Sequence, residues 1–402
     1  MMDFNFSKES LELQDKLKTF FVDHIYPNED HYENAIIDSG DPLHIPEILS
    51  ELKSIAKKEN LWNLFLPDNE YGYGLSNVDY APLAEITGHN WWAPEVFNCS
   101  APDTGNMEIL AEFGTSEQKK QWLEPLLEGE IRSCFAMTEP NVASSDATNI
   151  GSSIVSDGDN YVINGRKWWT SNAINPNAKI CIFMGVTNPD SPPYQRQSQV
   201  LVPMDSEGLS IIRPMQVFGY DDGYTGHPEL LFDNVVVPKS NIIGGEGMGF
   251  KIAQARLGPG RIHHCMRAIG MAERALSLMI DRSLERETFG QKLAEQGVIQ
   301  DWIARSRIKI EEARLLTLKT AWLIDTVGKE EAKIEISSIK VSVVEAASYV
   351  IDKAIQTHGA MGLSQDTPLA RMSAGARVLR IADGPDEVHL RSIARREINK
   401  HR

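Results

Sequence analysis

Asp383 lies in the segment RIADGPDEVH, residues 380–389, between an apolar helical run and the pair Gly384–Pro385. Two roles suit a carboxylate in this position. Asp is a favoured N-cap and a helix commonly opens after a proline, so the side chain could satisfy free backbone N–H groups. A carboxylate on a loop where glycine permits close backbone approach could instead act as a general base. These ten residues alone favour the cap.

Four further segments combine residue types that can bind a ligand. FAMTEPNVASSD, residues 135–146, contains a Glu-Pro-Asn turn and ends in hydroxyls, and WWTSN, residues 168–172, carries a tryptophan pair. RETFGQ, residues 286–291, contains an arginine and a glycine, and QTHGAMG, residues 356–362, contains two glycines. Taken without other information, a turn, two packed aromatic rings and two helix ends are sufficient explanations.

The composition limits the class of protein. The chain has 402 residues, enough for two or three domains, and its 42% apolar and 24% charged residues are typical of a globular protein. A formal net charge of -16 disfavours nucleic-acid binding. The four cysteines show neither CxxC nor Cys/His spacing, which predicts no disulfide framework and no metal site.

The N-terminal residues MMDFNFSKES lack the basic start and the apolar core of a signal peptide. No uninterrupted apolar stretch approaches the length that a membrane-spanning helix needs. We therefore expect a cytoplasmic protein without a membrane segment.

The spacing of apolar residues changes twice along the chain. It follows a helical period in the first third, beginning with Ser7–Ile25 behind a serine cap, and helices are also expected at 45–58, 78–88 and 116–127. Short β-rich runs follow, with a hairpin expected at Asp157-Gly158-Asp159. After Gly244 the helical period returns, and helices are expected at 247–284, 298–327, 329–358 and 385–399.

This order of elements predicts an α+β protein with three domains. The expected domains are an all-α N-terminal domain (1–131), a small antiparallel β domain (132–240) and a C-terminal four-helix bundle (241–402). No GxGxxG follows an expected strand, so a dinucleotide-binding Rossmann unit is not supported.

The motifs, and the order in which they follow one another over essentially the whole chain, resemble those of the acyl-CoA dehydrogenase family of flavoproteins. FAMTEPNVASSD looks like the TEPGAGSD-type signature, NGRKWWTSN is similar to NGxKxWITN, and GEGMGF with QARL resembles GEGFxxAMxxLxxxR. RETFGQ and QTHGAMG resemble R-x-x-F-G-(K/Q) and Q-x-x-G-G-x-G. ADGPDEVH takes the place of the R-I-Y-E-G-T-S-type segment and looks like a branch with Asp in the catalytic glutamate's position. The resemblance thus favours Asp383 as a base over a cap.

The resemblance implies FAD as the cofactor and assigns its contacts. The residues expected at the isoalloxazine ring are Ala136, Met137, Thr138, Ser145, Trp169, Thr170 and Ser171. Ser144 is the alternative to Ser145, because the loop is one residue longer than in the family. The residues expected at the phosphates and ADP, often of a neighbouring subunit's FAD, are Arg286, Phe289, Gln296, Gln356, Gly359 and Ala360. The residues expected at the substrate are Ser145, Arg256 and Gly384.

The implied reaction is α,β-desaturation of an acyl-CoA thioester to a trans-2-enoyl-CoA, as in fatty acid β-oxidation. Asp383 would remove the α-proton, and flavin N5 would take the β-hydride. The implied partners are an acyl-CoA substrate, an electron-transferring flavoprotein as acceptor, and a second copy of the chain in a homodimer or homotetramer.

Two other functions fit the same fold. One is a flavin oxidase similar to nitroalkane oxidase, in which an Asp removes a proton from an activated carbon; oxygen reactivity and peroxide formation separate it from a dehydrogenase. The other is a catalytically idle FAD-containing binding protein. The acidity of the chain argues against nucleic acid as its ligand.

Overall fold

The computed structural model describes residues 5–68, 70–220 and 222–402, so the first four residues of the N-terminal segment, Asn69 and Asp221 lie outside the description. The chain divides into two compact units. The bundle unit comprises residues 5–26, Gly74–Pro94 and Gly260–Arg402, and the sheet unit comprises Pro27–Tyr73 and Glu95–Pro259. The expected boundaries at 131 and 240 remain a prediction.

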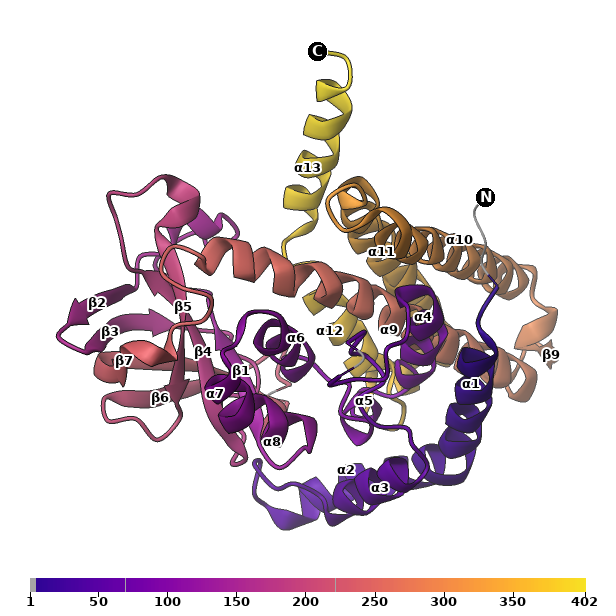
Figure 1. Cartoon of the computed structure of the whole chain (residues 1–402). Helices are drawn as coiled ribbons and strands as arrows, with labels where there is room; N and C mark the ends of the chain where they lie inside the picture. The colour runs from indigo at the N-terminus through magenta and orange to yellow at the C-terminus, as the bar shows by residue number, and fades with distance from the viewer. Residues whose placement is uncertain (1–4, 69, 221) are drawn as a thin grey trace. The chain divides into compact units, whose positions relative to one another are not determined.

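The bundle unit is built from long helices, among which α10 and α11 pack side by side (Figure 1). Its helices are α1 (Lys8–Phe20), α4 (Asn77–Thr87), α9 (Gly249–Glu285, from Gly260 onward), α10 (Gly297–Val327), α11 (Lys333–His358), α12 (Leu369–Leu379) and α13 (Asp386–Asn399). Val343, Ala347, Val350 and Ala354 on α11 are buried at three- and four-residue spacing, which forms a core-facing stripe.

Two helix ends in this unit show why the chain folds as the sequence predicted. The Ser7 hydroxyl accepts a hydrogen bond from Ser10 N at 3.1 Å, which confirms the serine cap of α1. Asp325 of α10 accepts the backbone N–H groups of Asn77 and Val78 at 3.0 Å each, so a carboxylate from another helix satisfies the start of α4.

The C-terminal part of the chain contains five helices rather than the four expected. The additional helix, α12, is the apolar run that precedes Asp383, and it begins directly after Pro368. The expected loop after α9 contains a two-stranded hairpin formed by β8 (Glu287–Thr288) and β9 (Gln291–Lys292).

The sheet unit holds a seven-stranded sheet whose strand order is β1-β4-β2-β3-β7-β6, with β5 paired to β4. The strands are β1 (Arg132–Ala136), β2 (Ser153–Asp157), β3 (Asn160–Lys167), β4 (Ala178–Val186), β5 (Gln197–Pro203), β6 (Leu209–Met215) and β7 (His227–Pro238). Asp157 pairs with Asn160 across a two-residue turn, in which Gly158 has φ 57°; this confirms the predicted hairpin.

The prediction of an antiparallel sheet needs a correction at β4. Both β1 and β2 pair with β4 in parallel, whereas β5 pairs with it antiparallel. More than 40 residues separate β1 from β4, which is ample length for the crossover that a parallel pair requires. The near-continuous apolar run KICIFMGV is the pattern of a strand buried on both faces. In β4, the six consecutive residues 180–185 are buried, as is Ala178, whereas Lys179 is exposed.

Helices in the sheet unit are α2 (Glu29–Ser39), α3 (Glu47–Lys58), α6 (Asp103–Phe113), α7 (Ser116–Gln118) and α8 (Glu124–Leu127), and α5 (Ala93–Val96) lies at its boundary. Helices α2 and α6 were not predicted. All four cysteines are buried, and none forms a disulfide in the described part of the chain. Within the described residues, every helix is too short or too polar to cross a bilayer.

Candidate active site

Asp383 occupies a tight turn between α12 and α13. Its φ is 55° and that of Gly384 is 103°, so two consecutive residues take left-handed conformations. In the described chain, α13 begins after Pro385 without a side-chain cap. Pro385, and not Asp383, thus occupies the N-cap position of α13, and the Asp383 carboxylate is 17% exposed.

Helix α9 supplies the side chains that surround this turn. Arg261 Nε donates to the Asp383 carbonyl oxygen at 3.0 Å, and His264 Nε2 lies 3.4 Å from Asp383 Oδ2. Arg267 Nη2 contacts His264 Nδ1 at 3.3 Å. Residues at this spacing share one helix face. Because a guanidinium can only donate, Nδ1 of His264 accepts, and its proton resides on Nε2, which faces the carboxylate.

The same turn is closed from the other side by α13. His389 Nε2 contacts the Asp383 carbonyl oxygen at 3.3 Å. Burial, together with the nearby charges of Arg261 and Lys340, lowers the pKa of His389 to about 4, so the ring is neutral at pH 7. A Cβ on Gly384 would lie 2.9 Å from His389 Nε2, which explains why glycine is needed there.

Sequence reasoning selected Arg256 as the arginine near the substrate and missed Arg261. Arg256 belongs to the sheet unit, where its Nε donates to Asn106 Oδ1 at 2.9 Å and its guanidinium lies 4.2 Å above the Phe135 ring. The arginine that contacts the Asp383 turn is Arg261. The pattern L-x-x-x-R counted from Leu257 ends at Arg261, so the spacing contained the signal.

In the sheet unit, the ends of β1 and β3 bring two predicted cofactor segments together. Trp168 N donates to Thr138 O at 3.0 Å, and Lys167 Nζ donates to Met137 O at 3.0 Å. Lys167 is fully buried and also pairs with Glu139 at 2.7 Å. Burial lowers the pKa of Lys167 to about 8, although Glu139 opposes that shift. Ala136, the last residue of β1, is buried.

The loop after β1 separates the two serine candidates. Ser144 Oγ accepts from Glu139 N at 2.9 Å, so its hydroxyl closes the loop on itself. Ser145 and Thr138 are exposed. This geometry favours Ser145 as the residue that meets a ligand.

After β3, Trp169 has φ 53° and is 38% exposed, and Ser171 follows it in the turn. Ser171 Oγ lies 2.8 Å from His227 Nδ1, and His227 Nε2 lies 3.0 Å from Asp222 Oδ2. The His227 ring centroid is 6.0 Å from that of Trp169. Neither His227 nor Asp222 was found from the sequence, because 56 residues separate His227 from Ser171.

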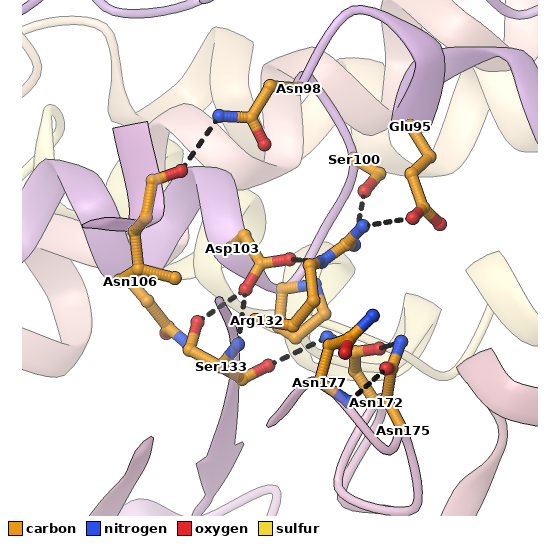
Figure 2. Close-up of polar contacts among 12 residues, drawn as sticks. Glu95, Asn98, Ser100, Asp103, Asn106, Arg132, Ser133, Asn172, Asn175 and Asn177 are labelled. Carbon is orange, nitrogen blue, oxygen red and sulfur yellow. Dashed lines mark hydrogen bonds and ion pairs between the residues drawn. The ribbon is translucent and has the colours of Figure 1, made fainter. Parts of the chain in front are cut away.

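A buried polar network anchors the turn that contains these residues (Figure 2). Arg132 pairs with Glu95 and Asp103, and Asp103 Oδ1 accepts from the backbone N–H of Ser133 at 2.7 Å. Asn172 Nδ2 then donates to Ser133 O at 3.0 Å. Burial alone would raise the pKa of the Glu95 carboxyl, but Arg132 and Lys53 hold it below its ordinary value. The network therefore fixes the turn through fully paired charges.

The residues expected at phosphates and ADP lie at two exposed positions of the bundle unit. Phe289, at the tip of the β8–β9 hairpin, has φ 50° and is 98% exposed, and Arg286 beside it is exposed. Gln356, Gly359 and Ala360 are exposed where α11 ends, and Gly359 is its C-cap with φ 66°. Gln296 precedes α10 and is half-buried. Their role in binding a cofactor remains a prediction.

Comparisons with known proteins give the class. Family models match for the acyl-CoA dehydrogenase N-terminal domain at residues 7–130, the middle domain at 134–235 and the C-terminal domain at 247–398. The chain therefore belongs to the acyl-CoA dehydrogenase family, whose members are oxidoreductases that bind FAD.

Individual relatives agree with this assignment. The chain is 55% identical over 403 residues to probable acyl-CoA dehydrogenase FadE2 of Mycobacterium tuberculosis, covering 100% of this chain and 98% of that protein. It is 54% identical to human acyl-CoA dehydrogenase family member 11 over 98% of this chain, but it spans only 50% of that protein.

Solved structures show the same fold. A putative acyl-CoA dehydrogenase from Mycobacterium abscessus superposes with a TM-score of 0.96 at 49% identity, covering 99% of this chain and 100% of that one. Butyryl-CoA dehydrogenase from Megasphaera elsdenii superposes with a TM-score of 0.83 at 26% identity, over 99% of this chain and 100% of that one.

The sheet unit carries groups that fit FAD. An exposed indole face at Trp169 is flanked by the hydroxyl of Ser171 in the same turn. Two buried polar atoms of this turn, Trp168 Nε1 and Thr170 Oγ1, have no hydrogen-bond partner among the described residues. Unpaired buried groups of this kind are uncommon in folded proteins and occur where a bound group completes a site.

Proposed function

We propose that this protein is an FAD-dependent acyl-CoA dehydrogenase that desaturates an acyl-CoA thioester, with Asp383 as the base that removes the α-proton. The observation that carries the proposal is the geometry of Asp383. Its carboxylate is withdrawn from solvent on a left-handed turn that precedes the N-cap of α13, and it lies 3.4 Å from His264 Nε2. It also lies within the residues that match the C-terminal family domain.

Each neighbour of Asp383 has a defined task in this mechanism. Arg261 fixes the backbone of the turn through the Asp383 carbonyl, and His264 directs its Nε2 proton at Oδ2. A carboxylate whose position is fixed can reach the α-carbon without a reorganisation cost. Gly384 is the proposed backbone contact for the thioester carbonyl, where negative charge develops as the proton leaves. When bound, FAD supplies the acceptor of the β-hydride.

The sheet unit would hold the isoalloxazine ring through the β1 end, Ser145, Trp169, Thr170 and Ser171. The support is that Thr138 and Trp168 are joined by a backbone hydrogen bond of 3.0 Å, so both predicted segments lie at one place. Arg256 remains the proposed substrate contact of this unit.

The exposed Phe289 supports the proposal that a second copy of the chain is present. An aromatic side chain that is 98% exposed gains stability if a neighbouring subunit or its cofactor covers it. We therefore propose a homodimer or homotetramer in which Arg286, Phe289, Gln296, Gln356, Gly359 and Ala360 contact the FAD of a neighbour. The proposed electron acceptor is an electron-transferring flavoprotein.

The test is an anaerobic titration of the purified protein. FAD content is measured first, and a panel of saturated acyl-CoA thioesters is then added while the flavin absorbance is followed. We expect bleaching by some of the thioesters, and fast reoxidation by an electron-transferring flavoprotein with little peroxide formed in air. Bleaching by nitroalkanes alone, with peroxide formed in air, would favour an oxidase. A colourless protein that takes up no FAD would refute the proposal.

A further inference from the structure

His227 stands between the turn after β3 and an acidic side chain. Its Nε2 lies 3.0 Å from Asp222 Oδ2, and its Nδ1 lies 2.8 Å from Ser171 Oγ. A carboxylate can only accept, so the proton of the neutral imidazole resides on Nε2. The lone pair on Nδ1 of this neutral ring is then an acceptor, and the donor that meets it is the hydroxyl of Ser171.

The backbone around this contact is fixed from both sides. Asn172 N donates to Gly226 O at 2.9 Å, and Thr170 N donates to Pro228 O at 3.2 Å. These two bonds bracket both Ser171 and His227, so the distance between the two side chains does not depend on a flexible loop. His227 is also the first residue of β7 and pairs with Met215 of β6.

We propose that Asp222 and His227 set the direction of the Ser171 hydroxyl, so that Ser171 presents lone pairs rather than a proton to a bound flavin. A hydroxyl has one proton, and here that proton is given to His227. This inference rests on the proposed function, which places Ser171 near flavin N5. His227 acts only through Ser171 and is a positioning residue.

The direction of this hydroxyl has a consequence for the redox equilibrium. The reduced flavin carries an N–H at N5, whereas the oxidised flavin carries a lone pair there. An acceptor at this position stabilises the reduced form, and a donor stabilises the oxidised form. The Asp222–His227–Ser171 series therefore raises the flavin reduction potential and favours uptake of the hydride.

The first test reads the protonation of the His227 ring in the wild-type protein, and a variant serves only to assign its signal. The protein is labelled with ¹⁵N-histidine and studied at a pH where its exposed imidazoles are neutral, and the signal of His227 is identified by its loss in His227→Phe. We expect a protonated Nε2 and an unprotonated Nδ1. A protonated Nδ1 would overturn the inference, because Ser171 would then be free to donate toward the flavin.

The second test measures the midpoint potential of the FAD-loaded protein. We expect His227→Phe and Ser171→Ala both to shift it to more negative values, and the double variant to shift it no further than the larger single shift. A tenfold loss of preference for the reduced form corresponds to about 30 mV for a two-electron couple.

The matched control is His31→Phe, an exposed histidine on α2 of the same unit, which should leave the potential unchanged. An unchanged potential in both site variants, with FAD still bound, would overturn this inference and leave the proposed function standing. A wild-type protein that binds no FAD would overturn both.

Discussion

His264 in the bundle unit and His227 in the sheet unit each have one ring nitrogen in contact with a charged side chain, but the two charges have opposite sign. The Arg267 cation takes the lone pair of His264 Nδ1, so that His264 directs a proton toward Asp383. The Asp222 anion takes the proton of His227 Nε2, so that His227 offers a lone pair to Ser171. The residue type alone does not decide whether a histidine donates or accepts; the charge behind it does.

The two regions also differ in what fixes their backbones. The Asp383 turn is held by side chains of α9 and α13 that contact its carbonyl oxygen. The turn after β3 is held by backbone bonds and by the buried network around Arg132. The geometry of the Asp383 turn therefore depends on a few side chains, each of which can be replaced by itself. The geometry of the turn after β3 depends on buried charges that also stabilise the fold.

Replacing Asp383 by Asn tests whether the bundle unit supplies the general base. The amide keeps the size of the side chain but cannot accept the α-proton, so flavin reduction by acyl-CoA should slow by roughly 10⁴-fold, the upper end of what a general base contributes. Anaerobic stopped-flow absorbance measures the rate. FAD content should not change, and Asp366→Asn, an exposed loop position of the same unit, is the matched control. Reduction at the wild-type rate in Asp383→Asn would show that another group is the base.

Replacing Arg132 by Met tests the framework of the sheet unit. The change leaves the carboxylates of Glu95 and Asp103 buried without their shared cation. The free energy of unfolding should fall by about 3–5 kcal/mol. Urea unfolding followed by circular dichroism measures it. A loss below about 1 kcal/mol would mean that the network does not anchor the turn.

Lowering the pH should reduce the free energy of unfolding, because His389 beside the Asp383 turn becomes protonated. Its pKa in the folded protein is about 4, below its unfolded value, so the unfolded chain binds the extra proton first as the pH falls. The stabilisation is complete above about pH 6.5 and is lost progressively down to pH 4, by roughly 3 kcal/mol. Urea unfolding of the wild type and of His389→Gln across this range isolates the contribution. If both proteins lose stability equally, the ring does not titrate as described.

Replacing His264 tests whether this histidine donates a proton toward the Asp383 carboxylate. Removal of the side chain in His264→Ala should slow flavin reduction about 10–30-fold, because the carboxylate loses a charge-assisted contact. His264→Gln restores a donor at a similar reach and should stay within about threefold of the wild type. Stopped-flow measurements of both variants decide between a donor and a packing role. Equal losses in Ala and Gln would contradict the donor role.

Local patterns predicted much of the fold. The serine cap of α1 and the β2–β3 hairpin depend on neighbouring residues, and both were confirmed. The direction of β4 could not be derived, because a strand buried on both faces has the same apolar pattern in either direction. Asp383 was proposed from its segment, and the spacing of the L-x-x-x-R motif could also have pointed to Arg261. His264 was also within reach, since it lies three residues from Arg261 on one helix face.

The sheet unit was harder to predict at its site. Ser171 was named from its motif, but the partners that orient its hydroxyl come from β7 and the turn before it. Such contacts form only when the strands pair at a particular register, and that register cannot be predicted from a single sequence.

The most direct test of the proposed base is hydrogen exchange at the α-carbon. The FAD-loaded protein is incubated anaerobically with a saturated acyl-CoA in D₂O, without an electron acceptor, and the recovered thioester is analysed by mass spectrometry. We predict deuterium at the α-carbon with the wild type and at least about 100-fold slower incorporation with Asp383→Asn. Incorporation at the wild-type rate by an Asp383→Asn protein that retains its FAD would contradict the account.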